Sequence, residues 1–323
     1  MKHIYITLFL LLALLAGSCE RPTDSDIDND NIPPEVPAGL RFYLATDGEI
    51  IIEWNRNSEP DIQGYNVYRK VNNSGFENIS FTSNYYYYDD SLNYEDEYFY
   101  MITAVDIFGQ ESRPTGSIST KPINRYQPYP PRYIEINARN WEGNKSIYLN
   151  WEPSTDTDVA GYNIYRSESE TFTADSLTLT GFSETTSFND ISVQDFYKKF
   201  YYRVKAVDKG GLLSDETNRV TDEIYEIPEV IIPANSSTTE YFGNFKIMAA
   251  DVPATYKIVV QTNKYFGEFW SRTINSSVVN DTLEIGFNPR YLESREYFWR
   301  VITYSASSEP NSISPVYSFT IKP

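Results

Sequence analysis

Cysteine and histidine, which supply most protein nucleophiles and many metal ligands, are almost absent from this chain. Its 323 residues include one cysteine, Cys19, and one histidine, His3. If His3 is removed with a signal peptide and Cys19 is modified, the mature chain cannot carry out Ser-His-Asp or Cys-His catalysis. Histidine-bound metals, thiolate-bound metals and disulfides are excluded in the same way. Carboxylate pairs of the glycosidase type remain, but they need a cleft. We therefore predict no catalytic, cofactor-binding or metal site.

The N-terminus has the pattern of a secreted lipoprotein. An apolar run from Ile4 to Ala16 follows the polar Lys2 and His3, and it ends in Ala16-Gly17-Ser18-Cys19. Such a run has the length of a signal-peptide core and is too short to span a bilayer stably. The small residues resemble a lipobox, although Ala16 stands where leucine is preferred. An ordinary secretory signal cut near Cys19 is the alternative.

We predict a signal peptide over residues 1–18 and lipidation of Cys19, which would anchor the protein by its acyl chains. The lipid is then the membrane partner, and the expected location is the cell envelope, on the outer membrane and exposed at the surface.

Residues 19–36 are predicted to be an acidic, disordered tether. The segment contains proline and few large apolar groups, so it cannot bury enough surface to offset its chain entropy. Alternate aspartates over 24–30 could suggest calcium, but the segment lacks the turn glycine and the bidentate glutamate of a calcium loop. The chain's net charge of −18 also argues against a nucleic-acid partner.

The rest of the chain contains an internal repeat. WNRNSEPDIQGYNVYR (54–69) matches WEPSTDTDVAGYNIYR (151–166), and YFYMITAVDIFGQES (98–112) matches FYYRVKAVDKGGLLS (200–214). Apolar residues recur at every second position, as Ile50, Ile52 and Trp54 do on one face of their run, and turn-forming residues separate the runs. A period near 100 residues is typical of one domain, and alternation of period two indicates antiparallel strands of a sandwich.

At these residues the chain resembles the fibronectin type III family, and as a whole it resembles a bacterial, Bacteroidota-like lipoprotein built from such domains. The resemblance implies an all-β fold of three tandem sandwiches, with Trp54 in the first core and Tyr98 as the tyrosine corner beside Leu92. Phe200 replaces that tyrosine in the second unit. The predicted domains are residues 37–122, 123–225 and 226–323. The strands expected in the first are 38–45, 48–54, 63–71, 76–82, 84–89, 97–106 and 111–120.

The third unit is more divergent. Its strands are predicted at 245–249, 254–261, 297–304 and 312–323, with Ile247 near the place of the tryptophan. Its segment NKYFGEFWSRT carries Tyr265, Phe266, Phe269 and Trp270. Four large rings in six residues exceed what one face of a strand can bury, so we predict a ligand-binding patch there. Packing at the sheet edge is the structural alternative.

Three short motifs resemble the Asp-Ser/Thr-aliphatic O-glycosylation site of Bacteroidota. Their hydroxyl residues are Ser91, Ser176 and Thr282. The resemblance implies glycan attachment at each of these residues.

We expect a non-catalytic, surface-exposed adhesion or scaffolding lipoprotein that presents tandem fibronectin type III modules to a protein partner. The alternative is a carbohydrate-binding accessory lipoprotein of a glycan-uptake or degradation system. Exposed rings on the third unit would favour the alternative, and broad patches over several units would favour scaffolding. The sequence identifies neither the protein nor the glycan.

Overall fold

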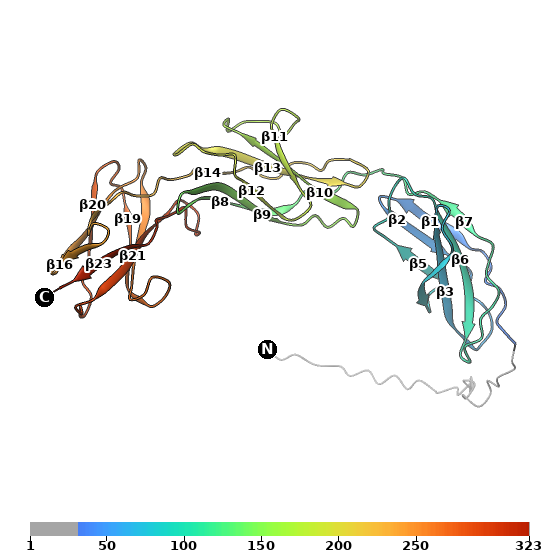
Figure 1. Ribbon diagram of the computed structural model, residues 1–323. Coiled ribbons are helices and arrows are strands. Elements are labelled where there is room, and N and C mark those ends of the chain that lie inside the picture. The colour runs from blue at the N-terminus through green and yellow to red at the C-terminus, as the bar shows by residue number, and fades with distance from the viewer. Residues whose placement is uncertain (1–31, 323) are drawn as a thin grey trace, which may run out of the picture. The chain divides into compact units, whose positions relative to one another are not determined.

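The computed structural model describes residues 32–322. All regular secondary structure in that range is β-strand (Figure 1). The predicted signal peptide, Cys19 and the tether up to residue 31 lie outside the described residues. The chain divides into two compact units. The first holds the described residues up to Ala45 with Glu49–Asp89 and Glu95–Lys121, and the second holds the remainder.

The first unit is a β-sandwich of two sheets. Ile50, Ile52 and Trp54 stand at every second position, and all three are buried in the core. Asp47 and Gly48 both have positive φ, which is the geometry of a two-residue hairpin turn. One sheet has the order β1 (Arg41–Thr46), β2 (Glu49–Glu53), β5 (Tyr86–Asp89). The other has the order β4 (Glu77–Thr82), β3 (Ile62–Val71), β6 (Tyr98–Asp106), β7 (Ile118–Thr120).

The first sandwich begins inside the segment predicted to be a disordered tether. Pro34 is buried, and the backbone N–H of Glu35 donates to Glu59 Oε1 at 2.8 Å. Asn57 Nδ2 donates to the carbonyl of Glu35 at 2.8 Å. The predicted boundary at residue 36 therefore lies past the point where the chain meets the sandwich.

The second sandwich repeats this strand order, as the duplicated motifs predict. Its sheets are β8 (Arg132–Trp141), β9 (Asn144–Glu152), β12 (Ser187–Asp190), and β11 (Leu179–Ser183), β10 (Val159–Ser167), β13 (Phe200–Asp208), β14 (Val220–Asp222). The rings of Trp151 and Tyr162 meet edge to face at 5.3 Å, as those of Trp54 and Tyr65 do.

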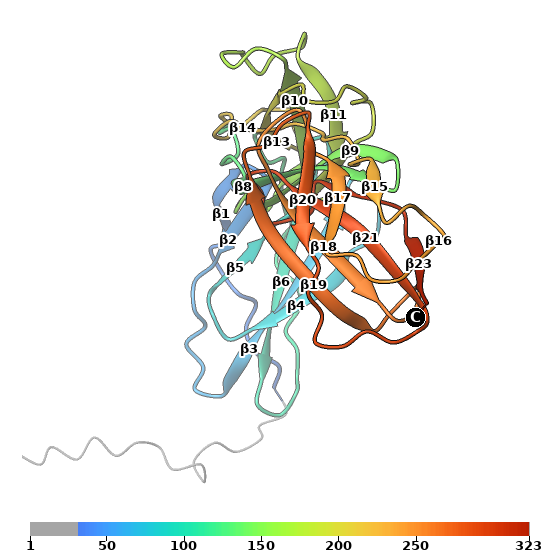
Figure 2. The ribbon, with the colours of Figure 1, turned by 90° about the vertical axis from the view of Figure 1, so that its left-hand side faces the viewer.

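The third sandwich has one sheet of β15 (Val230–Ile232), β17 (Asn244–Met248) and β20 (Thr282–Gly286). Its other sheet places β18 (Ala254–Gln261) between β19 (Glu268–Ser276) and β21 (Glu296–Tyr304), as Figure 2 shows. The last strand is split into β22 (Ser312–Ile313) and β23 (Tyr317–Ile321), and β16 (Ser237–Thr239) pairs with β23.

The place of the core tryptophan in the third sandwich belongs to Ala249, two residues after Ile247, which the sequence analysis put near that place. The backbone N–H of Trp54 donates to Tyr85, and that of Trp151 donates to Thr186, each at 3.0 Å. Ala249 donates in the same register to Asp281 at 2.9 Å. The missing ring is offset by Phe245 and Trp299, whose centroids are 4.7 Å apart in the core.

The cores of the first two sandwiches contain a hydrogen-bonded group of three polar side chains, and the third sandwich has apolar side chains at the same three positions. Asp89 accepts from Tyr100 and Arg69 in the first sandwich, and Asp190 accepts from Tyr202 and Arg166 in the second. The strand registers place Ile285, Trp299 and Val260 at these positions in the third sandwich. All three side chains are fully buried there, since their partners are also apolar.

The tyrosine corner is present in the third sandwich as well. Tyr297 is buried and its hydroxyl accepts from the backbone N–H of Glu293 at 3.0 Å. Tyr98 and Leu92 are buried in the first sandwich, and Phe200 is buried in the second. The sequence comparison found the corner at Tyr98 but not at Tyr297.

Within the second unit, one continuous sheet joins the second and third sandwiches. Strand β22 pairs in parallel with β8, which links β12-β9-β8 to the β21 sheet. Asn311 lies at this junction with no exposed surface. Its side chain accepts from the N–H of Tyr225 and donates to the carbonyl of Glu223, each at 2.8 Å. The backbone of Asn140 donates to the carbonyl of Asn311 at 2.7 Å.

Candidate functional site

Tyr265 and Phe266 lie at the tip of the β18–β19 hairpin. The turn is closed by the N–H of Thr262, which donates to the carbonyl of Gly267 at 3.0 Å. Gly267 adopts a φ of 82°, which residues with a β-carbon rarely adopt. Tyr265 is 80% exposed and Phe266 is 68% exposed. These two rings therefore face solvent.

Phe269 and Trp270 instead pack against the third core. Gln261 pairs with Glu268 and Val260 with Trp270, so the strand contains one extra residue at Phe269. Such a bulge allows neighbouring side chains to leave the strict alternation of a strand. Trp270 stacks on Phe245 with centroids 5.9 Å apart and meets Phe287 edge-on at 5.1 Å. Phe269 lies 5.0 Å from the Tyr297 ring.

The four predicted rings are therefore not one patch. Phe269 and Trp270 line a hollow of about 390 Å³, whereas Tyr265 and Phe266 do not. The remaining walls come from the loop between β20 and β21, and they are Asn288, Pro289, Arg290 and Tyr291. Tyr291 is 67% exposed, and its ring meets Phe269 edge-on at 6.0 Å.

The sequence analysis missed Asn288, Arg290 and Tyr291. They occur in NPRY (288–291), a loop segment with a single ring and no periodicity to mark it. The hollow combines aromatic walls with an amide and a guanidinium. This combination can stack on the flat face of a ring-shaped ligand and donate hydrogen bonds at its edge.

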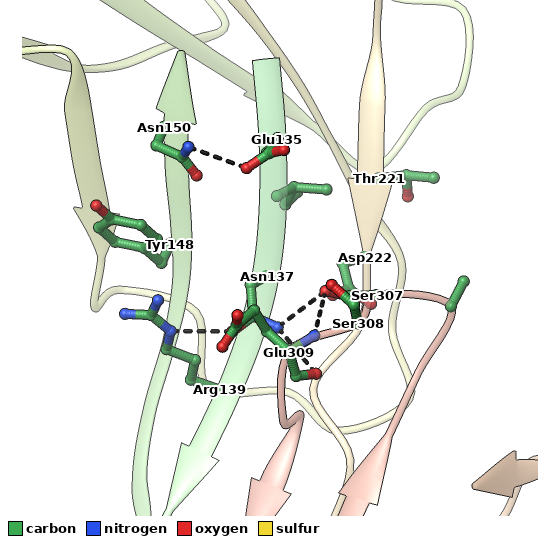
Figure 3. A pocket seen from close by; sticks show the side chains of 12 residues that line it. Glu135, Asn137, Arg139, Tyr148, Asn150, Thr221, Asp222, Ser307, Ser308 and Glu309 are labelled. Carbon is green, nitrogen blue, oxygen red and sulfur yellow. Dashed lines mark hydrogen bonds between the residues drawn. The ribbon is translucent and has the colours of Figure 1, made fainter. Parts of the chain in front are cut away.

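A second hollow, of about 660 Å³, lies within the second unit where the second and third sandwiches meet (Figure 3). Its walls are the outer face of β8 and β9, part of β14, and the 306–309 loop after β21. The labelled side chains are Glu135, Asn137, Arg139, Tyr148, Asn150, Thr221, Asp222, Ser307, Ser308 and Glu309. This site was not predicted from the sequence, because its walls come from three separate segments.

Arg139 is the only positively charged side chain that lines this second hollow. Its guanidinium lies 4.0 Å from the centroid of the Tyr148 ring and 4.7 Å from that of Trp141. The Nε atom donates to Asn137 Oδ1 at 2.9 Å. Burial lowers the pKa of Arg139, opposed by the nearby Tyr148 and Glu309.

Asp222 lies on the opposite wall of the hollow. Burial raises the pKa of its carboxyl, and hydrogen bonds from Ala138, Glu223 and Ser305 oppose that shift. The backbone N–H of Ala138 donates to it at 2.8 Å, which ties β14 to β8. Asn137 Nδ2 reaches Ser307 Oγ and the carbonyl of Glu309, each at 3.4 Å.

The three hydroxyl residues of the predicted O-glycosylation motifs are all exposed. Ser176 lies in a tight turn, in which the N–H of Leu177 donates to Asp175 Oδ1 at 2.9 Å. Ser91 has a positive φ of 57°, and Thr282 begins β20. Glycan attachment at these residues stays a prediction.

The described part of the chain contains no cluster of three or more histidine, cysteine, aspartate or glutamate residues arranged to bind a metal ion. Across the same residues, no helix has the length and apolar character needed to cross a membrane.

Comparison with known proteins gives one similar curated sequence. No family model matches the chain. Over 205 residues, 61% of this chain is 27% identical to Exoglucanase B of Cellulomonas fimi. The match covers 17% of that protein, so the chain spans less than a fifth of its length. Among solved structures, the chicken CNTN1 FN1-FN3 domains match at 13% identity with a TM-score of 0.31. That match covers 90% of this chain and 100% of the other.

The strand order of its own sheets defines the fold. The first two sandwiches each place their first, second and fifth strands in one sheet, opposite a second sheet built on their third and sixth strands. The third sandwich has the same order once the short β16, which pairs with β23, is left out of the count. The fold is fibronectin type III-like. The all-β, tandem-sandwich prediction is thereby confirmed.

Proposed function

We propose that this protein is a non-catalytic glucan-binding lipoprotein whose third sandwich holds the ligand. The observation that carries the proposal is the hollow formed by Phe269, Trp270 and Tyr291, with Arg290 and Asn288 at its edge. Aromatic side chains offer an apolar face to the C–H groups of a sugar ring, while the polar groups bind its hydroxyls. The similarity to an exoglucanase supports glucan as the ligand class.

The lining of the hollow argues for binding without hydrolysis. Hydrolysis of a glycosidic bond ordinarily needs two carboxyl groups on either side of that bond. None of the six residues that line the hollow carries a carboxyl group. The hollow therefore lacks the general acid and the second carboxylate that hydrolysis needs.

The lipid anchor is part of the proposal. Acyl chains on Cys19 would hold the protein at the envelope, because two or more chains give stable membrane attachment. Fractionation of cells that express the wild type or Cys19→Ala, with acyl labelling, tests this step. We expect label and membrane attachment in the wild type alone; an unlabelled wild type with a membrane-bound variant would contradict the anchor.

A second candidate, protein adhesion or scaffolding, is favoured by the outer face of the first sandwich. Tyr43, Tyr86 and Tyr88 are exposed on the β1-β2-β5 sheet, whereas Phe42, the neighbour of Tyr43 on β1, packs against the buried Tyr100. Exposed aromatic rings gathered on one surface are typical of protein-binding sites. This candidate predicts that loss of these tyrosines, and not changes in the third sandwich, abolishes partner binding.

The test of glucan binding uses the full mature chain and three soluble hexasaccharides. These are cellohexaose, laminarihexaose and maltohexaose, titrated by calorimetry, with chromatography of the sugars afterwards. We expect saturable binding of at least one and no shortened products. Absence of binding at millimolar sugar would contradict the proposal, and release of shorter sugars would overturn the non-catalytic assignment.

A further inference from the structure

The hollow between β8, β9 and the 306–309 loop has features of a binding site in its own right. Its volume of about 660 Å³ lies within the usual range for small-ligand sites. Its floor is the outward face of β8 and β9, which the core of the second sandwich does not use.

The guanidinium of Arg139 is held in place while some of its N–H donors make no hydrogen bond to the described residues. The Nε atom is fixed by Asn137, and the rings of Tyr148 and Trp141 lie against the guanidinium. Among the described residues, no acceptor binds its Nη1 and Nη2 atoms, and it forms no ion pair. A planar donor pair that is oriented in advance loses little entropy when a ligand oxygen binds.

The other side chains around Arg139 supply acceptors and further amide groups. Glu135 accepts from Asn150 Nδ2 at 3.1 Å on the β8–β9 face, and Glu309 lies on the opposite loop. Carboxylates, amides and a guanidinium together can both donate to and accept from neighbouring hydroxyl groups.

The charged side chains that line the hollow favour an uncharged ligand. The hollow carries one guanidinium and the acidic residues Glu135, Asp222 and Glu309, within a chain of net charge −18. An anionic ligand would face this excess of acidic groups, and a cation would face Arg139. An uncharged ligand rich in hydroxyl groups avoids both penalties.

We propose that this hollow is a second sugar-binding site, in which Arg139 binds hydroxyl oxygens of a glucan. The ligand class rests on the proposed function, whereas the site itself rests on the geometry of Arg139. Because the walls come from both sandwiches, a bound sugar contacts β8 and the 306–309 loop together.

The test monitors each site through its own tryptophan. The chain has five tryptophans, so 5-fluorotryptophan labelling of the full chain gives a small fluorine spectrum. Trp141→Phe and Trp270→Phe assign the signals for the junction hollow and for the third-sandwich hollow. The probe is the hexasaccharide that binds most tightly of the cello, laminari and malto series.

We expect both signals to shift as the sugar is added. In Arg139→Ala, the shift at Trp141 should require about tenfold more sugar or vanish, because a charged hydrogen bond is lost, while the Trp270 shift stays unchanged. Arg139→Lys keeps the charge without the planar donor pair, so the sugar concentration needed for its Trp141 shift should lie between those of the wild type and Arg139→Ala. Unchanged positions of the other fluorine signals establish that each variant is folded.

The outcomes separate the two proposals. A Trp270 shift without a Trp141 shift, or a Trp141 shift insensitive to Arg139→Ala, overturns the second site and leaves the proposed function standing. A Trp141 shift that Arg139→Ala abolishes, with Trp270 unmoved, overturns the third-sandwich site alone. If neither signal moves with any of the three sugars, both proposals are wrong.

Discussion

The hydroxyl of Tyr100 donates to the carboxylate of Asp89 at 2.5 Å across the two sheets of the first sandwich. Tyr100 lies on β6 and Asp89 on β5, so the bond joins the sheets through the core. Arg69 donates to the same carboxylate at 2.8 Å. The second sandwich repeats the arrangement, with Asp190, Tyr202 and Arg166.

Asp190→Ala should lower the free energy of unfolding of the second sandwich by about 2–4 kcal/mol. Removing one partner of a buried ion pair leaves the other charge uncompensated, and partial exposure of Arg166 reduces the full cost. Chemical denaturation of the purified chain measures it. Asp90→Ala, at an exposed position, is the control and should stay within about 0.5 kcal/mol. Equal effects of the two changes would contradict a role for the buried carboxylate.

The same carboxylate should make stability depend on acid pH. Burial would raise the pKa of Asp190, but hydrogen bonds from Ser192 and Tyr202 and the charge of Arg166 bring it below the ordinary value. A lowered pKa in the folded state gives stabilisation that is complete above the unfolded-state pKa and is lost as the pH falls through the folded value. The free energy of unfolding should therefore decline below about pH 4.

Denaturation curves at stepped pH values check this dependence. Asp190→Asn cannot titrate, so its stability should be lower near neutral pH and should change less below about pH 4. A decline of the same size in the wild type and in Asp190→Asn would assign the acid sensitivity to other groups.

Trp54→Ala and Trp151→Ala should each destabilise their own sandwich by about 3–5 kcal/mol, because a large buried ring leaves a cavity. The third sandwich has Ala249 at the position of these tryptophans. There we expect Trp299→Ala, on the opposite sheet, to cause a similar loss in the free energy of unfolding. Denaturant unfolding of each variant is the measurement. A near-neutral Trp299→Ala would mean that another side chain fills the third core.

Asn311→Ala should weaken the junction between the second and third sandwiches by about 2–4 kcal/mol. It leaves the N–H of Tyr225 and the carbonyl of Glu223 buried without partners. Asn235→Ala removes a single exposed hydrogen bond, to the N–H of Ser318, and is the matched control. Thermal unfolding should show Asn311→Ala separating into two transitions; one unchanged transition would contradict the account of the junction.

The duplicated motifs made most of the fold predictable from sequence. The strands of the first sandwich lie close to their expected positions, and alternation of buried and more exposed residues marks β2 and much of β6. The last strand is the exception: the expected 111–120 contracts to β7 at Ile118–Thr120. Before it, the chain follows β6 through an isolated bridge from Glu111 to Val105 and single backbone hydrogen bonds from Ser112 and Thr115, a pattern that alternation does not reveal.

The candidate sites were less predictable, for two physical reasons. The bulge at Phe269 turns that ring and Trp270 toward the core, and bulges depend on pairing with the neighbouring strand rather than on local sequence. The partner ring, Tyr291, lies on another loop, and the junction hollow gathers residues that are more than 160 positions apart, from Glu135 to Glu309. Such contacts follow from tertiary packing alone.

The most direct test of the proposed function is glucan titration of Tyr291→Ala. This ring lines the third-sandwich hollow yet is largely exposed, so its loss should leave the fold intact. Tyr43→Ala, an equally exposed tyrosine on the first sandwich, is the control. Loss of a stacking ring should weaken binding by about 1–3 kcal/mol, by analogy with nucleic-acid bases on aromatic rings. The account predicts a loss of at least about fivefold in the affinity reported by Trp270 in Tyr291→Ala, with Tyr43→Ala unchanged. Unaltered binding in Tyr291→Ala, or an equal loss in both variants, would contradict it.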